Sequence, residues 1–169
     1  MTIGGAMAIE IERKFLVNGD AWRAGVAGRM QLRQGYLANN ERVSVRVRVA
    51  GRSAWLSVKS MVPGRSRAEF EYPVPREDAD AMLDALCARP FVEKWRHLVP
   101  FAGRRWEVDE FLGDNAGLVL AELEIESEDA PFERPPWLGP EVTEDVRFYN
   151  FSLATRPWQT FRGEFGDVA

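Results

Sequence analysis

A short charged segment near the amino terminus, EIERK at residues 10–14, constrains the fold of this chain more than any other feature. It lies inside the apolar stretch 9–17, and successive side chains of a β-strand point to opposite faces. As a strand, the segment sends Glu10, Glu12 and Lys14 to one face and the residues between them to the other. Two carboxylates on one face can share a divalent cation, and a neighbouring lysine can meet an anion that the cation carries.

The same alternation of charged and apolar residues recurs along the rest of the chain, and the charged faces contain few Ser, Thr, Asn or Gln residues. Two arrangements satisfy this pattern. The apolar faces can form a common core with the charges in water, or the sheet can curve with its charges inward while helices cover the apolar outside. Inward charges are costly unless they are paired, solvated or bound to ions. The charged faces carry Arg46 and Arg48; Arg67, Glu69 and Glu71; Lys94 and Arg96; Glu107 and Asp109; and Glu122, Glu124 and Glu126.

Most of the predicted elements are strands. Helices are expected near 20–27, at 77–86, where apolar residues recur at helical spacing, and in a carboxy-terminal segment capped by Thr143 or Asp145. The Pro-rich stretch 130–140 is expected to form turns. Seven or eight strands with few helices predict an α+β, mostly antiparallel protein built as a closed or nearly closed barrel. The strands are predicted at 9–17, 30–37, 43–49, 55–59, 67–74, 91–99, 104–111 and 119–127.

Length and composition limit the classes of protein that fit. The chain has 169 residues, enough for one domain, which we place at 7–163 with flexible termini at 1–6 and 164–169. A net charge of −4 argues against nucleic-acid binding. A single cysteine, Cys87, excludes an internal disulfide and predicts a cytoplasmic location. There is no apolar run long enough for a membrane span, so no membrane partner is expected.

Taken in order, the charged motifs resemble the CYTH superfamily, the triphosphate tunnel metalloenzymes. The match begins at the EIERK segment and covers nearly the whole chain, to about Trp158. It includes the sequence QGYL at 34–37 and ends with a VTEDVR segment at 142–147 and Asn150. Each motif alone is weak, whereas the ordered set is specific. The resemblance implies an eight-stranded closed antiparallel barrel that forms a tunnel, with charged faces inside and helices packed outside.

The resemblance also implies roles for individual residues. The metal-binding carboxylates would be Glu10, Glu12, Glu122 and Glu124, with Asp109 a weaker addition, and the metal would be Mg²⁺ or Mn²⁺. The phosphate-binding and charge-stabilising residues would be Lys14, Arg46, Arg48, Lys59, Lys94 and Arg96. Arg67, Glu69 and Glu71 also match family positions. Their role is either structural ion pairing or support of the active site, and the two alternatives have equal weight.

The expected activity is metal-assisted hydrolysis of a phosphoanhydride, with inorganic triphosphate as the small-molecule substrate. A thiamine or nucleoside triphosphatase and an adenylate cyclase are the alternatives among enzymes. An organic substrate would need an aromatic platform, and most of the 6 tryptophans lie on apolar faces. A non-catalytic polyphosphate-binding domain is the alternative of another class, although a pure binder could omit the metal ligands. A homodimer is left open.

Overall fold

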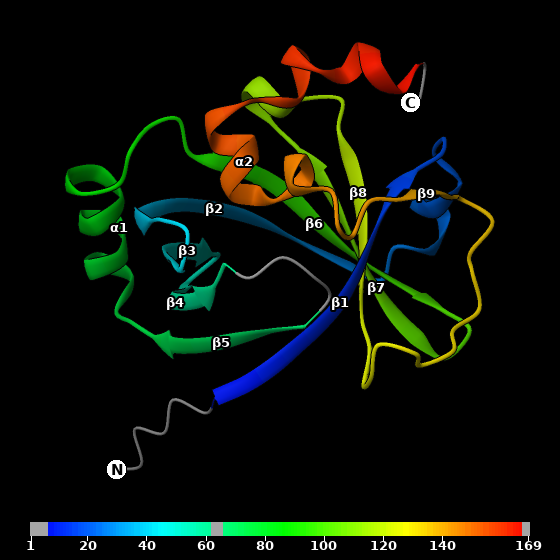
Figure 1. Cartoon of the computed structure of the whole chain (residues 1–169), viewed down its shortest axis with the longest axis horizontal. Helices are drawn as coiled ribbons and strands as arrows, with labels where there is room; N and C mark the ends of the chain where they lie inside the picture. Colours follow the sequence, from blue (N-terminus) through cyan, green and yellow to red (C-terminus); the bar gives the residue numbers. More distant parts are fainter. Residues whose placement is uncertain (1–6, 62–65, 167–169) are drawn as a thin grey trace.

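The structure is a computed structural model that describes residues 7–61 and 66–166 (Figure 1). Within this part, the side chains of residues 7–9, 66 and 67 lie outside the description. Two α-helices and several short 3-10 helices accompany the strands. The strands are β1 (Met7–Val17), β2 (Gly28–Asn39), β3 (Val43–Ala50), β4 (Ser53–Ser60), β5 (Ser66–Pro73), β6 (Val92–Phe101), β7 (Arg104–Phe111), β8 (Val119–Glu124) and β9 (Leu138–Glu141). The helices are η1 (Ala21–Gly25), α1 (Arg76–Ala85), η2 (Gly113–Asn115), η3 (Val146–Phe148), α2 (Asn150–Thr155), η4 (Trp158–Thr160) and η5 (Arg162–Phe165).

All nine strands belong to one antiparallel sheet, in the order β5-β4-β3-β2-β6-β7-β8-β1-β9. Strand β1 also pairs with β5 at the other end of this order. Its first half, Met7–Ile11, pairs with β5, whereas residues 12–16 pair with β8. Strand β1 therefore runs between the β2–β5 side and the β6–β8 side of the molecule, as the ribbon shows (Figure 1).

The predicted α+β class with a mostly antiparallel sheet is confirmed, but the closed eight-stranded barrel needs correction. The sheet has nine strands, and β1 changes its partner between Ile11 and Glu12. In the described registers, no residue of β1 pairs with β5 and β8 at the same time. The two ends of the sheet thus meet through successive halves of one strand, and hydrogen bonding does not close the sheet into a continuous ring.

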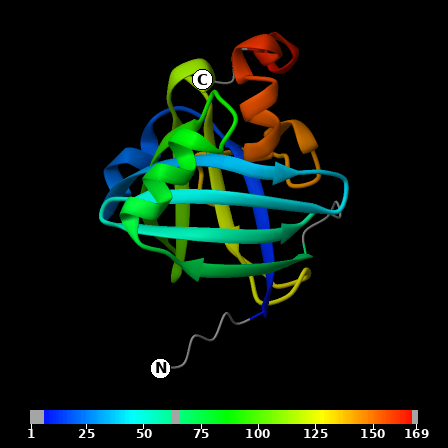
Figure 2. The ribbon, with the colours of Figure 1, turned by 90° about the vertical axis from the view of Figure 1, so that its left-hand side faces the viewer.

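Three apolar clusters pack against the sheet, and two of them cover its outer face. Helix α1 lies across the outer face of β3 and β4 and packs Ala79 and Leu83 against Val47 and Val49 (Figure 2). A second cluster lies around Trp106. The third lies on the inner face, where Leu16, Phe111 and Leu120 follow the charged residues along their strands, and α2 and the 3-10 helices near the carboxy terminus cover it around Phe148. Because two clusters cover the outer face, the charged side chains face one another inside, next to the third cluster.

The rest of the sequence prediction differs from the structure in small ways. Strand β9 lies in the stretch predicted to form turns. It has only four residues and includes Gly139 and Pro140, so no alternating pattern in the sequence indicated a strand. The expected flexible terminus at 164–169 stays a prediction; in its described part, Glu164 pairs with Arg147, and the Phe165 ring lies 5.2 Å from that of Phe148. Residues 1–6 and 167–169 lie outside the described residues, and the 7–163 domain boundary stays a prediction. In the described part of the chain, no helix has the length and apolar character needed to cross a membrane.

Candidate active site

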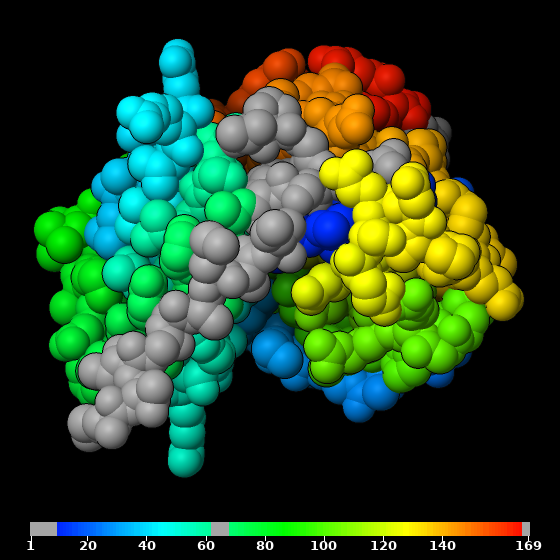
Figure 3. Space-filling model, turned by 60° about the horizontal axis from the view of Figure 1, so that its bottom comes forward, coloured from blue at the N-terminus to red at the C-terminus, as the bar shows by residue number. Residues whose placement is uncertain are grey.

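The charged strand faces meet around one open cavity of about 660 Å³. In the space-filling view, this face of the molecule is hollowed between the β2–β5 side and the β6–β8 side (Figure 3). Among the described residues, six cationic and five acidic side chains line the cavity, together with two amides and one apolar residue. These residues are Glu10, Glu12, Leu32, Gln34, Arg46, Arg48, Lys59, Lys94, Arg96, Arg105, Glu107, Glu122, Glu124 and Asn150.

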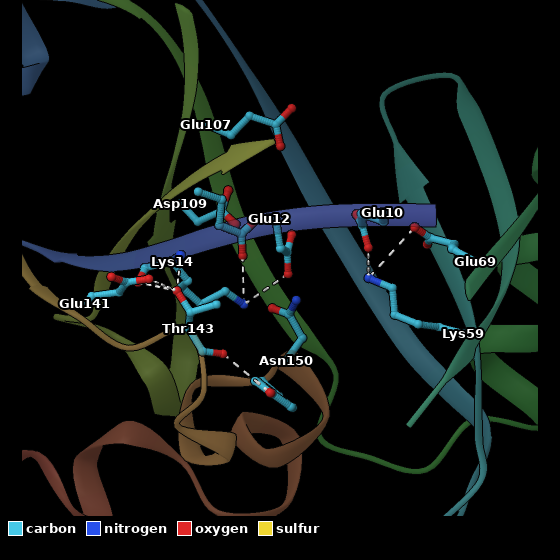
Figure 4. A network of polar contacts seen from close by, with 12 residues as sticks. Glu10, Glu12, Lys14, Lys59, Glu69, Glu107, Asp109, Glu141, Thr143 and Asn150 are labelled. Atoms are coloured by element: carbon cyan, nitrogen blue, oxygen red, sulfur yellow. Dashed lines mark hydrogen bonds and ion pairs between the residues drawn. The ribbon is translucent and has the colours of Figure 1, made fainter. Parts of the chain in front are cut away.

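Strand β1 places Glu10 and Glu12 along this cavity and Lys14 on the same face beside it, as its alternation predicts (Figure 4). Glu10 forms an ion pair with Lys59 of β4. Lys14 lies 2.9 Å from Glu122 of β8 and 3.9 Å from Glu12, and it lines an adjoining pocket. Strand β1 therefore brings its charges into contact with both sides of the sheet.

The floor of the cavity is a buried network centred on Asp109. Arg96 donates hydrogen bonds of 2.7 Å to Asp109 and Glu122 and also pairs with Glu107. Lys94 pairs with Asp109 from the other side, and its ammonium group lies 3.2 Å from the amide oxygen of Asn150. Asp109 is fully buried and lies behind the two cations, outside the cavity lining. Its role in metal binding stays a prediction; in the structure its oxygens are used by Lys94 and Arg96.

Burial and pairing set the protonation of these groups. Burial lowers the pKa of Lys94, although Asp109 opposes the effect. Burial alone would raise the pKa of Glu122, but the charges of Lys14 and Arg96 lower it well below its ordinary value. Burial raises the pKa of Glu107 despite Arg96. The network is therefore sensitive to any additional charge that enters the cavity.

On the opposite wall, two arginines of β3 point into the cavity with carboxylates of β5 behind them. Arg46 lies 3.3 Å from Glu69, and Arg48 lies 2.5 Å from Glu71. Glu69 also lies 3.8 Å from Lys59. Neither Glu69 nor Glu71 lines the cavity, and both pair with the cations in front of them. The side chain of Arg67 lies outside the described residues.

The acidic residues offer suitable oxygen donors for a hard divalent cation. Glu12 lies directly opposite Glu124 across β1 and β8, and Glu107 lies opposite Glu122 across β7 and β8. Like charges at opposed positions repel, which a bound cation would relieve. Among the described residues, no group of three or more acidic, His or Cys side chains is close enough to hold a metal. The chemistry of these donors fits such a cation, and Glu10, Glu12 and Glu122 would have to leave their present lysine and arginine partners to bind it.

Several residues of the site were not among those predicted. Glu107 and Arg105 precede Asp109 at intervals of two on β7, so the period of the strand already contained their signal. Gln34 is buried and donates a 3.2 Å hydrogen bond to the hydroxyl of Tyr36, which lines the adjoining pocket. Asn150 begins α2, and no strand pattern could have placed it beside Lys94.

Comparison with known proteins identifies the family. The family model of the CYTH domain matches residues 8–157 of this chain. The chain is a member of the CYTH domain family. The resemblance carried by the charged motifs is therefore confirmed.

Named relatives agree with this assignment. The chain is 46% identical to the inorganic triphosphatase of Acetivibrio thermocellus over 156 residues, which cover 92% of this chain and 99% of the relative. It is 39% identical to the inorganic triphosphatase of Nitrosomonas europaea, with 86% of this chain and 96% of the relative covered. A crystal structure of an inorganic triphosphatase superimposes with a TM-score of 0.64 at 36% identity, covering 89% of this chain and 97% of the other.

Proposed function

We propose that this CYTH protein is a metal-dependent hydrolase that cleaves inorganic triphosphate to diphosphate and phosphate. The observation that carries this proposal is the cavity lining. It contains cations and carboxylates in nearly equal number, and in its described part it has no aromatic side chain. Such a cavity suits a small polyanion that carries a divalent cation and has no organic group. The two inorganic triphosphatases among the relatives support the same substrate.

The proposed roles follow the two signs of charge. Glu10, Glu12, Glu122 and Glu124 would hold Mg²⁺ or Mn²⁺, and the bound ion would neutralise phosphate charge and make a water molecule more acidic. Six of the cations that line the two adjoining cavities would hold the phosphate oxygens. Arginine would act as a two-pronged donor and lysine as a point charge. These cations are Lys14, Arg46, Arg48, Lys59, Lys94 and Arg96.

In the structure each of these cations is paired with a carboxylate. Lys59, for example, contacts Glu10, and Lys14 contacts Glu122. Substrate binding therefore requires an exchange in which the cations leave carboxylate oxygens for phosphate oxygens. Because the partners belong to the protein, the cations are already oriented when the phosphates arrive, and they can stabilise charge on the leaving diphosphate. We propose that the triphosphate chain lies along the cavity beside β1.

One observation favours a second candidate. The adjoining pocket of about 470 Å³ shares Glu12, Arg46, Lys59 and Asn150 with the main cavity. Aromatic residues line it as well, including Tyr36, whose ring lies 5.9 Å from that of Phe151. A thiamine or nucleoside group could occupy such a pocket while its phosphates reach the cations.

A substrate panel tests these alternatives. Phosphate release is measured with inorganic triphosphate, thiamine triphosphate and ATP, each with Mg²⁺, with Mn²⁺ and with EDTA. We expect the highest kcat/KM for inorganic triphosphate and no turnover in EDTA. A higher kcat/KM for an organic triphosphate would favour the second candidate. Binding of triphosphate without turnover under any metal condition would identify a non-catalytic polyphosphate-binding domain and overturn the proposal.

A further inference from the structure

Arg105 of β7 lines the main cavity, yet its setting differs from that of the other cations there. Residues 105, 107 and 109 lie on the same face of the strand. The Asp109 side chain is fully buried, that of Glu107 is 30% exposed, and Arg105 is exposed. This face of β7 therefore leads from the floor of the cavity outward to its mouth, where Arg105 lies.

Arg105 also differs in its partners. Each of the other five cations that line the cavity lies within 4.0 Å of at least one carboxylate. For Arg105, the described residues contain no ion pair and no side-chain hydrogen bond. Its guanidinium group can therefore bind an anion without first leaving a carboxylate, and its exposure keeps the cost of desolvation small.

The position of Arg105 in the sheet is fixed although its side chain is exposed. It pairs with Pro100 of β6 in the sheet register, and it lies two residues after Gly103 of the β6–β7 turn, which has a φ of +74°. The guanidinium group thus extends from a rigid strand at the rim, beside a cavity that also contains Glu107 and Glu124. A positive charge here offsets the repulsion that these carboxylates exert on an incoming polyanion.

We propose that Arg105 is a substrate-binding residue that captures a phosphate group at the mouth of the cavity and so raises affinity for the triphosphate chain. This inference rests on the proposed function and adds to it a residue that sets affinity. The paired cations deeper in the cavity act where the bond breaks, whereas Arg105 acts on the chain as it enters. Its contribution is expected in KM and in equilibrium binding, with little effect on kcat.

Arg104 provides a matched control, because it is the preceding residue and carries the same charge. Its side chain lies on the opposite face of β7 and donates a 2.7 Å hydrogen bond to Glu126. Arg105→Ala and Arg104→Ala thus remove the same charge from opposite faces of one strand. Arg105→Lys keeps the charge but loses the two-pronged geometry, and we expect an intermediate effect.

The test combines kinetics with binding. Initial rates with inorganic triphosphate and saturating Mg²⁺ give kcat and KM, and calorimetry of triphosphate binding in EDTA gives Kd without turnover. Arg105→Ala is expected to raise KM and Kd about tenfold, the effect of losing one hydrogen bond between charged groups. We expect kcat to change less than twofold. Arg104→Ala should leave KM and Kd within about twofold of the original protein, and thermal unfolding should be the same for both variants.

Three results would overturn the inference: unchanged KM and Kd in Arg105→Ala, an equal rise in both alanine variants, or a fall in kcat alone. Failure of the proposed function is a separate outcome. In that case the unsubstituted protein would bind triphosphate but not hydrolyse it. The inference about Arg105 would then hold only if Arg105→Ala still weakened triphosphate binding.

Discussion

Lys94 and Asp109 form an ion pair beneath the cavity, and their side chains are only 2% and 0% exposed. Arg96, directly opposite Asp109 across β6 and β7, contacts the same carboxylate. One buried carboxylate therefore lies between two cations that would otherwise repel each other, and Glu107 and Glu122 add further negative charge beside Arg96. The inward charges of this sheet are tolerated because acidic residues behind the cavity wall hold the basic residues in front of them.

Asp109→Asn should for this reason reduce stability far more than it changes metal dependence. Removing one partner of a buried pair leaves the other charge uncompensated, which costs about 3 to 5 kcal/mol. We expect the free energy of unfolding, measured by urea denaturation, to fall by about this amount. The Mg²⁺ concentration for half-maximal activity should stay within about twofold under conditions where the variant is folded. A large increase in that concentration at unchanged stability would instead identify Asp109 as a metal ligand.

Glu124→Gln should have the opposite effects. Glu124 lines the cavity, is exposed, and has no ion pair within the described part of the chain. Its loss should leave the unfolding temperature nearly unchanged but raise the Mg²⁺ or Mn²⁺ concentration for half-maximal activity by at least about tenfold. Glu126→Gln is the control, since Glu126 lies two residues further along and pairs with Arg104 outside the cavity. Equal metal curves for the two variants would remove Glu124 from the proposed metal site.

Turnover should also depend on Glu12, which lies directly opposite Glu124. Glu12→Gln removes a carboxylate from the proposed metal site while keeping the size of the side chain. We expect activity to be lost at all metal concentrations that the assay allows, with the circular dichroism spectrum and cooperative unfolding retained. Near-normal phosphate release by a folded Glu12→Gln protein would show that this carboxylate does not bind the metal.

The alternation of residues along each strand predicted which side chains share the interior, because a strand of fixed period leaves no other choice. It placed Glu10, Glu12 and Arg96 on the correct faces. It could not give depth within the cavity, which depends on how neighbouring strands stagger, and so Asp109 and Glu124 were assigned the same kind of role. The sequence pattern also could not predict that β1 changes its pairing partner from β5 to β8, because strand partners are set by contacts between residues distant in sequence.

A different ion network, outside the cavity, predicts how stability depends on pH. Glu110 lies 2.7 Å from Arg23 and 3.2 Å from His97, and Arg23 also contacts Asp20. The hydrogen bond from Arg23 lowers the pKa of Glu110, although partial burial opposes it. A carboxylate with a lowered folded pKa stabilises the protein above its unfolded pKa of about 4.3, and this stabilisation is lost as the pH falls through the folded value.

Glu110→Gln should therefore lower the unfolding temperature at pH 7 by about 2 °C, the effect of a partly exposed ion pair worth below about 1 kcal/mol. Below the folded pKa the two proteins should unfold at the same temperature, because Glu110 is then neutral as well. Thermal scans in EDTA across this pH range provide the measurement, with the exposed Asp114→Asn as control. An equal difference at every pH would assign the effect to packing.

The last prediction concerns Gly35, which lets α1 approach the outer face of β2. A Cβ atom added at this position would lie 2.8 Å from the Cβ of Cys87 and 2.9 Å from a methyl group of the buried Leu83. Both distances are too short, so Gly35→Ala should push α1 outward and cost about 1 to 3 kcal/mol of unfolding free energy. Gly28→Ala, in the same strand with no atom within 4 Å of the added Cβ, should be neutral or slightly stabilising. Urea denaturation of both variants provides the test, and equal midpoints would mean that α1 does not depend on the close approach at Gly35.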